Sequence, residues 1–148
     1  MKTLIIYASK HGTTKQCAQI IHNNRKGDLH HIRECENLKP IDYDVIYIGS
    51  PVYAGRINKK IKQWIERYID DLKNKQSIVF LSGMNPDGLD EVIHQNFSDD
   101  IAKTLQLEHV GGAFKFDDMN MFEKFIVKVV AKETSSVDNV NYNKVKEL

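Results

Sequence analysis

The sequence predicts an α/β fold in which helices cover both faces of an open parallel sheet. Short apolar segments alternate along the chain with longer segments whose apolar residues recur at helical spacing. Such short, apolar strands are typical of a parallel sheet that is buried on both faces. The chain has 148 residues, a length that suits one domain, so we expect residues 1–148 to form a single domain.

Five strands are expected. Residues 2–8 form the first strand, and the more polar residues 29–33 form a weaker strand near an edge of the sheet. Three further apolar strands follow at residues 44–49, 77–81 and 107–116. The Gly111-Gly112 pair within the last strand marks a bend or a close approach of the backbone to another group.

Helices are expected between these strands and after the last one. The first helix spans residues 13–25, and Asn58 caps the second. A helical stretch follows Pro86-Asp87, and Ser98 begins another. Two apolar stripes at helical spacing mark the second and the last helix: Ile61, Trp64, Ile65, Tyr68, Ile69 and Leu72, then Phe122, Phe125, Ile126, Val129 and Val130. The remaining residues, 134–148, are polar and are expected to fray.

Charge and composition argue against several classes of function. The net charge of +1 argues against nucleic-acid binding, which needs a clustered basic surface. No apolar run is long enough to form a transmembrane segment, and no secretory signal precedes the first strand, so we expect a cytoplasmic protein. No metal site is expected, because Cys17 and Cys35 lack ligand spacing and the adjacent His30 and His31 point to opposite faces of a strand.

Three loops at the carboxyl ends of the strands have the composition of ligand loops. In open α/β sheets, ligands bind at this edge, beside the point where the strand order reverses. The loop after the first strand places hydroxyl residues around a glycine directly before a helix, where backbone N–H groups and the helix dipole attract phosphate. Each loop alone also fits an ordinary structural turn, but three together favour a ligand site. The candidate binding residues are Ser9, Lys10, His11, Gly12, Thr13 and Thr14; Pro51, Val52, Tyr53, Ala54 and Gly55; and Ser82, Gly83, Met84 and Asn85.

The ligand that best suits these loops is flavin mononucleotide (FMN). The first loop has neither the Lys-Ser/Thr pair of a Walker A motif nor a G-x-G-x-x-G pattern, which favours a single phosphate ester. Tyr53 can stack on a flat heterocycle. Backbone groups near Ala54 and Gly55 can hydrogen-bond its reactive edge, and the segment from Ser82 to Asn85 its pyrimidine side. A peptide flip at Gly55 can follow the protonation state of the ring.

From end to end, the chain resembles the flavodoxin family. The Ser-Lys-His-Gly-Thr-Thr loop matches that family's phosphate loop. The resemblance implies a flavodoxin-like three-layer sandwich with a five-stranded parallel sheet of order 2-1-3-4-5, and FMN as the cofactor. Residues 1–14, together with segments 112–116, 122–128 and 133–134, are also similar to one branch, the menaquinone-dependent type of flavodoxin-domain protoporphyrinogen oxidases.

These patterns predict electron transfer by bound FMN, with no catalytic side chain, because the cofactor supplies the chemistry. The expected partner is a redox protein or a small-molecule electron donor or acceptor. The apolar stripe from Phe122 to Val130 is also compatible with a peripheral membrane contact. The alternative is a protoporphyrinogen oxidase that passes electrons to a quinone. A response-regulator-like domain is disfavoured, because Tyr7–Lys10 stand where it would need clustered acidic residues.

Overall fold

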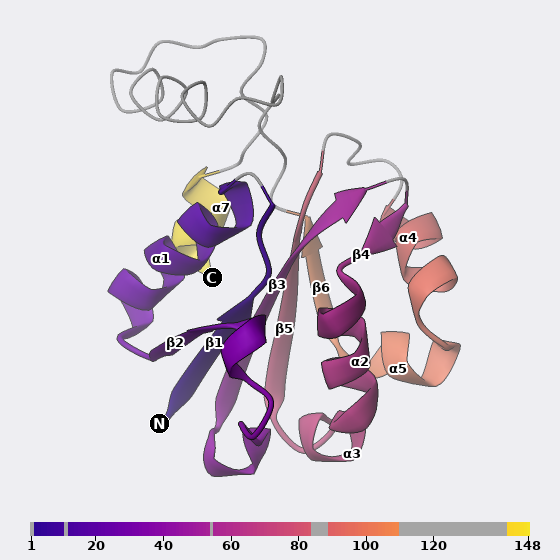
Figure 1. The fold of residues 1–148 in the computed structure, drawn as a ribbon, viewed down its shortest axis with the longest axis horizontal. Coiled ribbons are helices and arrows are strands. Elements are labelled where there is room, and N and C mark those ends of the chain that lie inside the picture. Colours follow the sequence, from indigo (N-terminus) through magenta and orange to yellow (C-terminus); the bar gives the residue numbers. More distant parts are fainter. Residues whose placement is uncertain (1, 11, 54, 84–88, 110–141) are drawn as a thin grey trace, which may run out of the picture.

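The computed structural model describes residues 2–10, 12–53, 55–83, 89–109 and 142–148. In these residues, one mainly parallel sheet lies between two helical layers (Figure 1). The main strand order is β2-β1-β3-β5-β6, and a short strand β4 pairs with β3 outside this path. Without the short β4, the strands β1, β2, β3, β5 and β6 are the first to fifth parallel strands along the chain. Their order in the sheet is then the predicted 2-1-3-4-5. The predicted fold class is therefore confirmed.

Each of the five expected strands is present. Their bounds are β1 Thr3–Tyr7, β2 Asp28–His31, β3 Val45–Tyr53, β5 Gln76–Ser82 and β6 Gln106–His109. Ile5 of β1 pairs with Tyr47 of β3, which pairs with Ile78 of β5. These parallel pairings bring the carboxyl ends of β1, β3 and β5 to the same edge of the sheet. The part of the last predicted strand beyond residue 109, with its Gly111-Gly112 pair, lies outside the described residues.

A hairpin at the end of β3 differs from the prediction. The sequence places the end of this strand at Gly49, whereas β3 continues through Pro51 to Tyr53. The chain then turns back into β4, Arg56–Ile57, which pairs antiparallel with β3. Gly55 has a φ of 75°, a left-handed conformation that favours glycine and closes the short turn. Residues interpreted as a loop are therefore part of an ordered hairpin.

Helices occupy both faces of the sheet (Figure 1). On one side lie α1, Thr13–Arg25, and α7, Tyr142–Glu147. The other side carries α2 Lys59–Arg67, α3 Ile69–Leu72, α4 Leu89–Asn96 and α5 Asp99–Thr104. Short 3-10 turns span Ile32–Glu34 and Pro40–Asp42. Among the described helices, none combines the length and the apolar character needed to cross a bilayer.

The predicted helix starts are confirmed. Asn58 Oδ1 accepts hydrogen bonds from the backbone N–H groups of Lys60 (2.9 Å) and Ile61 (3.1 Å), which caps α2. Ser98 caps α5 in the same way through the N–H of Ile101. The predicted helix over residues 122–130 lies outside the described residues.

The C-terminal residues are more ordered than expected. Residues 142–147 form α7, which packs against α1, and Val145 is fully buried. Arg25 Nε donates to the backbone oxygen of Leu148 at 2.7 Å, and the Tyr47 hydroxyl donates to the same oxygen. The expectation that this end frays is wrong for residues 142–148, because one buried valine and two long-range donors hold it to the domain.

Two apolar cores lie on the two faces of the sheet. The α1 face buries Ile5, Cys17, Ile21 and Phe80, among others, while Ile6, Ile48, Ile61 and Ile65 belong to the opposite core. Gly49 permits the close contact beneath α1. A Cβ atom there would lie 2.3 Å from the Phe80 ring and 3.0 Å from Thr14 Cγ2.

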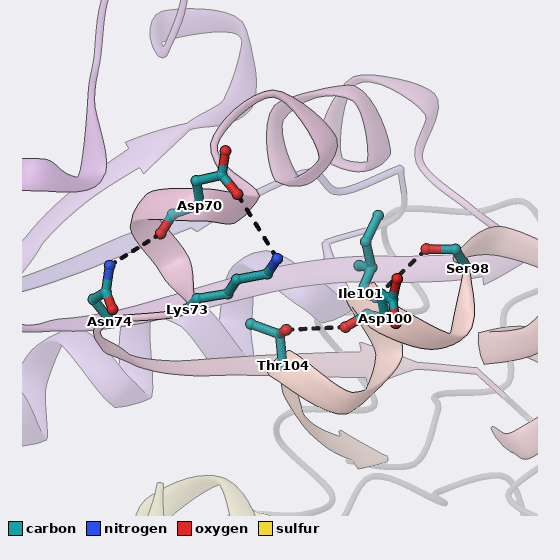
Figure 2. A network of polar contacts seen from close by, with 7 residues as sticks. All are labelled: Asp70, Lys73, Asn74, Ser98, Asp100, Ile101 and Thr104. Atoms are coloured by element: carbon teal, nitrogen blue, oxygen red, sulfur yellow. Dashed lines mark hydrogen bonds and ion pairs between the residues drawn. The ribbon is translucent and has the colours of Figure 1, made fainter.

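The helices α3 and α5 are adjacent on the face of the sheet opposite α1 (Figure 2). The polar contacts drawn there stay within each helix region: Lys73 Nζ lies 3.7 Å from Asp70 Oδ1, and the Thr104 hydroxyl donates to Asp100 O at 3.0 Å. The Asp70 carboxylate is almost fully exposed, so this ion pair adds little to stability. Such contacts close local turns, while Ile69 and Leu72 of α3 and Ile101 of α5 belong to the same apolar core.

Candidate functional site

The loop between β1 and α1 forms an open helix N-terminus at the carboxyl edge of the sheet. Gly12, the N-cap of α1, has a φ of 90°, and its N–H donates to Ser9 Oγ at 2.9 Å. No side chain in the described residues caps the first turn, and this turn holds no acidic residue. The free N–H groups of the turn are therefore available to an anion, whose charge the helix dipole favours.

Thr14 lies beneath this loop rather than on its surface. Its side chain is buried, and its Oγ1 lies 2.8 Å from Ser82 Oγ at the end of β5. This hydrogen bond links the first and third predicted ligand loops. Both are predicted site residues, but the sequence places Thr14 at the phosphate and Ser82 at the ring of the cofactor, without a contact between them.

Tyr53 ends β3 and stands beside the first loop. Its side chain is 45% exposed, and Lys10 Nζ lies 5.0 Å from the centre of its ring. Burial of the rest of the side chain raises the pKa of Tyr53 above its usual value, so the phenol stays protonated at neutral pH. Tyr53 therefore offers an accessible, uncharged aromatic face at the edge of the sheet.

Asn96, at the end of α4, was missed by the sequence reasoning. Its Nδ2 donates to Gly55 O (2.9 Å) and to Val92 O (2.6 Å), and its Oδ1 accepts from the N–H of Ile57 (3.1 Å). The side chain is nearly buried. It thus holds both sides of the turn between β3 and β4. No local pattern identifies such a residue, because its partners lie about forty positions earlier in the chain.

The hairpin is also held on its other side. The N–H of Asn58 donates to Ser50 Oγ at 2.8 Å, while the Ser50 hydroxyl donates to Pro51 O at 2.9 Å. These bonds join the start of α2 to the body of β3. Consequently, a segment expected to be a loop is held by the Asn96 side chain of α4 and by the backbone N–H of Asn58 at the start of α2.

The third loop is described only at its start. Ser82 is buried, and a Cβ atom on Gly83 would lie 3.4 Å from Val52 Cβ. The ends of β3 and β5 are therefore in contact distance at the predicted site. The predicted site residues His11, Ala54, Met84 and Asn85 lie outside the described residues.

A pocket of about 570 Å³ opens beside the first loop. Ser9, Lys10, Pro51 and Tyr53 line it, so the structure brings together residues from two of the three predicted loops. The pocket extends toward β2 and is also lined by His31 and Arg33, which the site prediction did not include. Gly12, Thr13, Thr14 and Ser82 do not line it.

Comparison with known proteins identifies the family. The sequence model of the flavodoxin-domain family matches residues 4–141 of this chain. A comparison with the curated proteins finds no match.

Several solved structures share the fold. A flavoprotein from Lactobacillus acidophilus, determined in complex with FMN, is 21% identical with a TM-score of 0.50, and the alignment covers 84% of this chain and 98% of that one. For a flavodoxin from the domain Archaea the identity is 14% and the TM-score 0.55, with 90% and 99% covered. Rubredoxin oxygen:oxidoreductase from Desulfovibrio gigas aligns with 13% identity and a TM-score of 0.60, over 89% of this chain and 36% of that protein.

The identities to these solved structures are low, so they support the fold alone, whereas the family model spans nearly the whole chain. The predicted flavodoxin resemblance is confirmed at this level. This chain belongs to the flavodoxin-domain family.

Proposed function

We propose that this protein binds FMN at the carboxyl edge of its sheet and transfers electrons through it. The observation that carries the proposal is the uncapped, acid-free N-terminus of α1, which begins at the left-handed Gly12, follows β1 and contacts the end of β5 through Thr14 and Ser82. A phosphate suits such a helix end. Membership of the flavodoxin-domain family supports the same cofactor, as does the flavoprotein of this fold whose structure contains FMN.

The first loop would hold the phosphate. The N–H groups that follow Gly12 are aligned with the helix axis, and Ser9, Thr13 and Lys10 add hydroxyl and ammonium donors. Thr14 would contribute to the phosphate site from beneath the loop, because its hydroxyl is in contact with the Ser82 hydroxyl. His11 completes the proposed set of phosphate-loop residues on sequence grounds.

The hairpin and the end of β5 would hold the ring. Tyr53 supplies an exposed aromatic face, while Pro51, Val52, Ser82 and Gly83 shape the ends of the two strands. The remaining proposed partners of the ring are the backbone groups of Ala54, Gly55, Met84 and Asn85. Bound FMN supplies the redox chemistry, since it takes up one or two electrons. The chain's own part is to bind, orient and stack, and no catalytic side chain is proposed.

The proposed setting is the cytoplasm, where the partner is a redox protein or a small-molecule electron donor or acceptor. Cys17 and Cys35 are free and buried, which suits a reducing compartment. Burial raises the pKa of each thiol to about 12. Both therefore remain protonated and unreactive at neutral pH.

The alternative function is that of a flavodoxin-type protoporphyrinogen oxidase. Its support is the resemblance of residues 1–14, which include β1 and the first loop, to that branch. Incubating the FMN-loaded protein with protoporphyrinogen and a menaquinone separates the two functions. Quinone-dependent formation of fluorescent porphyrin would favour the oxidase, and its absence would favour an electron carrier.

The FMN proposal is tested by titrating the cofactor-free protein with FMN and following flavin fluorescence. We expect saturable one-to-one binding, and a large loss of affinity in Gly12→Val, because Gly12 has a positive φ and lies where the phosphate must approach. The variant Gln19→Val is the control, since it introduces the same side chain at an exposed position of α1 that belongs to no part of the proposed site. Unchanged affinity in Gly12→Val would reject this loop as the phosphate site.

A further inference from the structure

The pocket on the β2 side of the first loop concentrates positive charge. Lys10, Arg33, Arg56 and Lys60 all line it, and none of the acidic residues that the structure describes does. In the part of the chain that the structure describes, none of these four cations forms an ion pair. The whole chain carries 21 basic and 20 acidic residues, so this local excess is not a consequence of overall composition.

The four cations come from four separate elements. Lys10 follows β1, Arg33 lies in the 3-10 turn after β2, Arg56 is in β4 and Lys60 is in the first turn of α2. All four are exposed, so water screens their mutual repulsion. Their convergence on one pocket is nevertheless unfavourable unless an anion occupies it, because each charge raises the potential felt by the others.

The potential in the pocket is evident at His31, which also lines it. The pKa of His31 is lowered below its usual value, first by burial and then by the positive charge of Arg33, with Lys15 and Lys60 acting in the same direction. The Glu34 carboxylate opposes this, and it accepts a hydrogen bond from the His31 N–H at 3.2 Å. At neutral pH His31 is therefore uncharged, and its Nδ1 accepts a hydrogen bond from the Arg33 N–H at 3.1 Å.

The floor of the pocket is partly apolar. Ile32 and Ile57 are buried side chains in its wall, and the Tyr53 ring forms one side. A volume of about 570 Å³ lies within the range of small-molecule sites, which combine apolar walls with a few polar groups. A compact inorganic anion would leave these apolar walls in contact with water.

The geometry points to a second ligand site here, for an organic molecule that carries two acidic groups, carboxylate or phosphate, on an apolar body. The pocket shares Ser9, Lys10, Pro51 and Tyr53 with the proposed FMN site, but it takes no residue from α1 or β5. The two ligands would therefore lie on either side of the Tyr53 hairpin. A role for the anion as a reaction partner of the cofactor rests on the proposed function, whereas its binding does not.

Calorimetry of the FMN-saturated protein tests this site with a naphthalene dicarboxylate as the probe. We expect saturable binding of one molecule per chain without release of FMN. Lys60→Gln and Arg33→Gln should each weaken binding by about tenfold, since each removes one charged contact. Lys62→Gln, on the same helix but outside the pocket lining, is the matched control and should bind as the unmodified protein does.

Two further probes separate the contributions of charge and apolar contact. The dimethyl ester of the same acid should not bind, and pyrophosphate should bind more weakly than the dicarboxylate. Equal binding of the ester, or pyrophosphate binding as tight as that of the dicarboxylate, would overturn the assigned ligand class. Release of FMN by the dicarboxylate, an equal loss in Lys62→Gln, or no saturable binding would overturn the site itself.

The FMN affinity of each variant keeps the two proposals distinct. Lys60→Gln and Arg33→Gln should retain normal FMN affinity, because neither residue belongs to the proposed cofactor site. If the protein bound no FMN, the proposed function would fail, and the same titrations on the cofactor-free protein would still test the pocket.

Discussion

The hydroxyl of Thr14, in the first turn of α1, lies 2.8 Å from the hydroxyl of Ser82 at the end of β5. Both side chains are buried. This bond joins the start of α1 to the end of β5, two segments of the proposed cofactor site. The shape of the site is therefore set partly by a contact between the protein's own side chains beneath it.

Thr14→Val tests the structural role of this bond. The valine keeps the shape of threonine but leaves the Ser82 hydroxyl without its partner, so we expect a loss of about 1–3 kcal/mol in the free energy of unfolding. Urea denaturation of the cofactor-free protein measures it. The double variant with Ser82→Ala should lose less than the sum of the two single losses, and strict additivity would show that the hydroxyls do not interact.

Gly49→Ala tests the close packing beneath α1. The added Cβ would lie 2.3 Å from the Phe80 ring, so the ring must move, and we expect a destabilisation of about 1–3 kcal/mol. Thermal unfolding should show a Tm lower by about 2–4 °C for each kcal/mol. Combining the change with Phe80→Leu should restore part of the loss. A Tm equal to that of the unmodified protein would contradict the packing described.

Asn96→Leu tests the support of the hairpin. The change removes the partners of Gly55 O and of the Ile57 N–H, so the hairpin should loosen and FMN affinity should fall by about tenfold or more. Asn96→Asp keeps the acceptor for Ile57 and should restore part of the affinity. Fluorescence titration with FMN measures both variants, and equal affinities for Asn96→Leu and the unmodified protein would exclude the positioning role.

Tyr53→Ala tests stacking on the cofactor. Because the side chain is 45% exposed, its loss leaves no core cavity, and the Tm of the cofactor-free protein should change little. FMN binding should weaken, and the two-electron potential should rise, since an electron-rich ring disfavours the anionic reduced flavin. Tyr53→Phe should stay close to the unmodified protein. An unchanged potential with a large fall in Tm would instead assign Tyr53 to the core.

The positions of the strands and main helices could be predicted because periodic apolar residues and turn residues are local signals, whereas the sheet order was implied by the flavodoxin resemblance. Trp64 illustrates this, because its position in a helical stripe predicts a core residue. The centre of its ring lies 5.1 Å from the centre of the Tyr68 ring, and its Nε1 donates to Leu38 O at 3.3 Å.

The features that could not be predicted depend on contacts distant in sequence. Ser50 and Pro51 usually end a strand, but here β3 continues because Asn58 and Asn96 support the hairpin beyond it. Polar composition likewise predicted a frayed C-terminus, whereas Val145 inserts into the core beside α1. The cations of the pocket belong to four elements whose convergence only the folded chain reveals.

The central claim is that the helix end after Gly12 binds the phosphate of FMN, and comparing FMN with riboflavin tests it most directly. Riboflavin has the same ring without the phosphate. The account predicts that the cofactor-free protein binds FMN at least about a hundredfold more tightly than riboflavin, because the phosphate makes several charge-assisted hydrogen bonds. It also predicts that Gly12→Val removes most of this difference. Equal affinities for the two flavins would contradict the account.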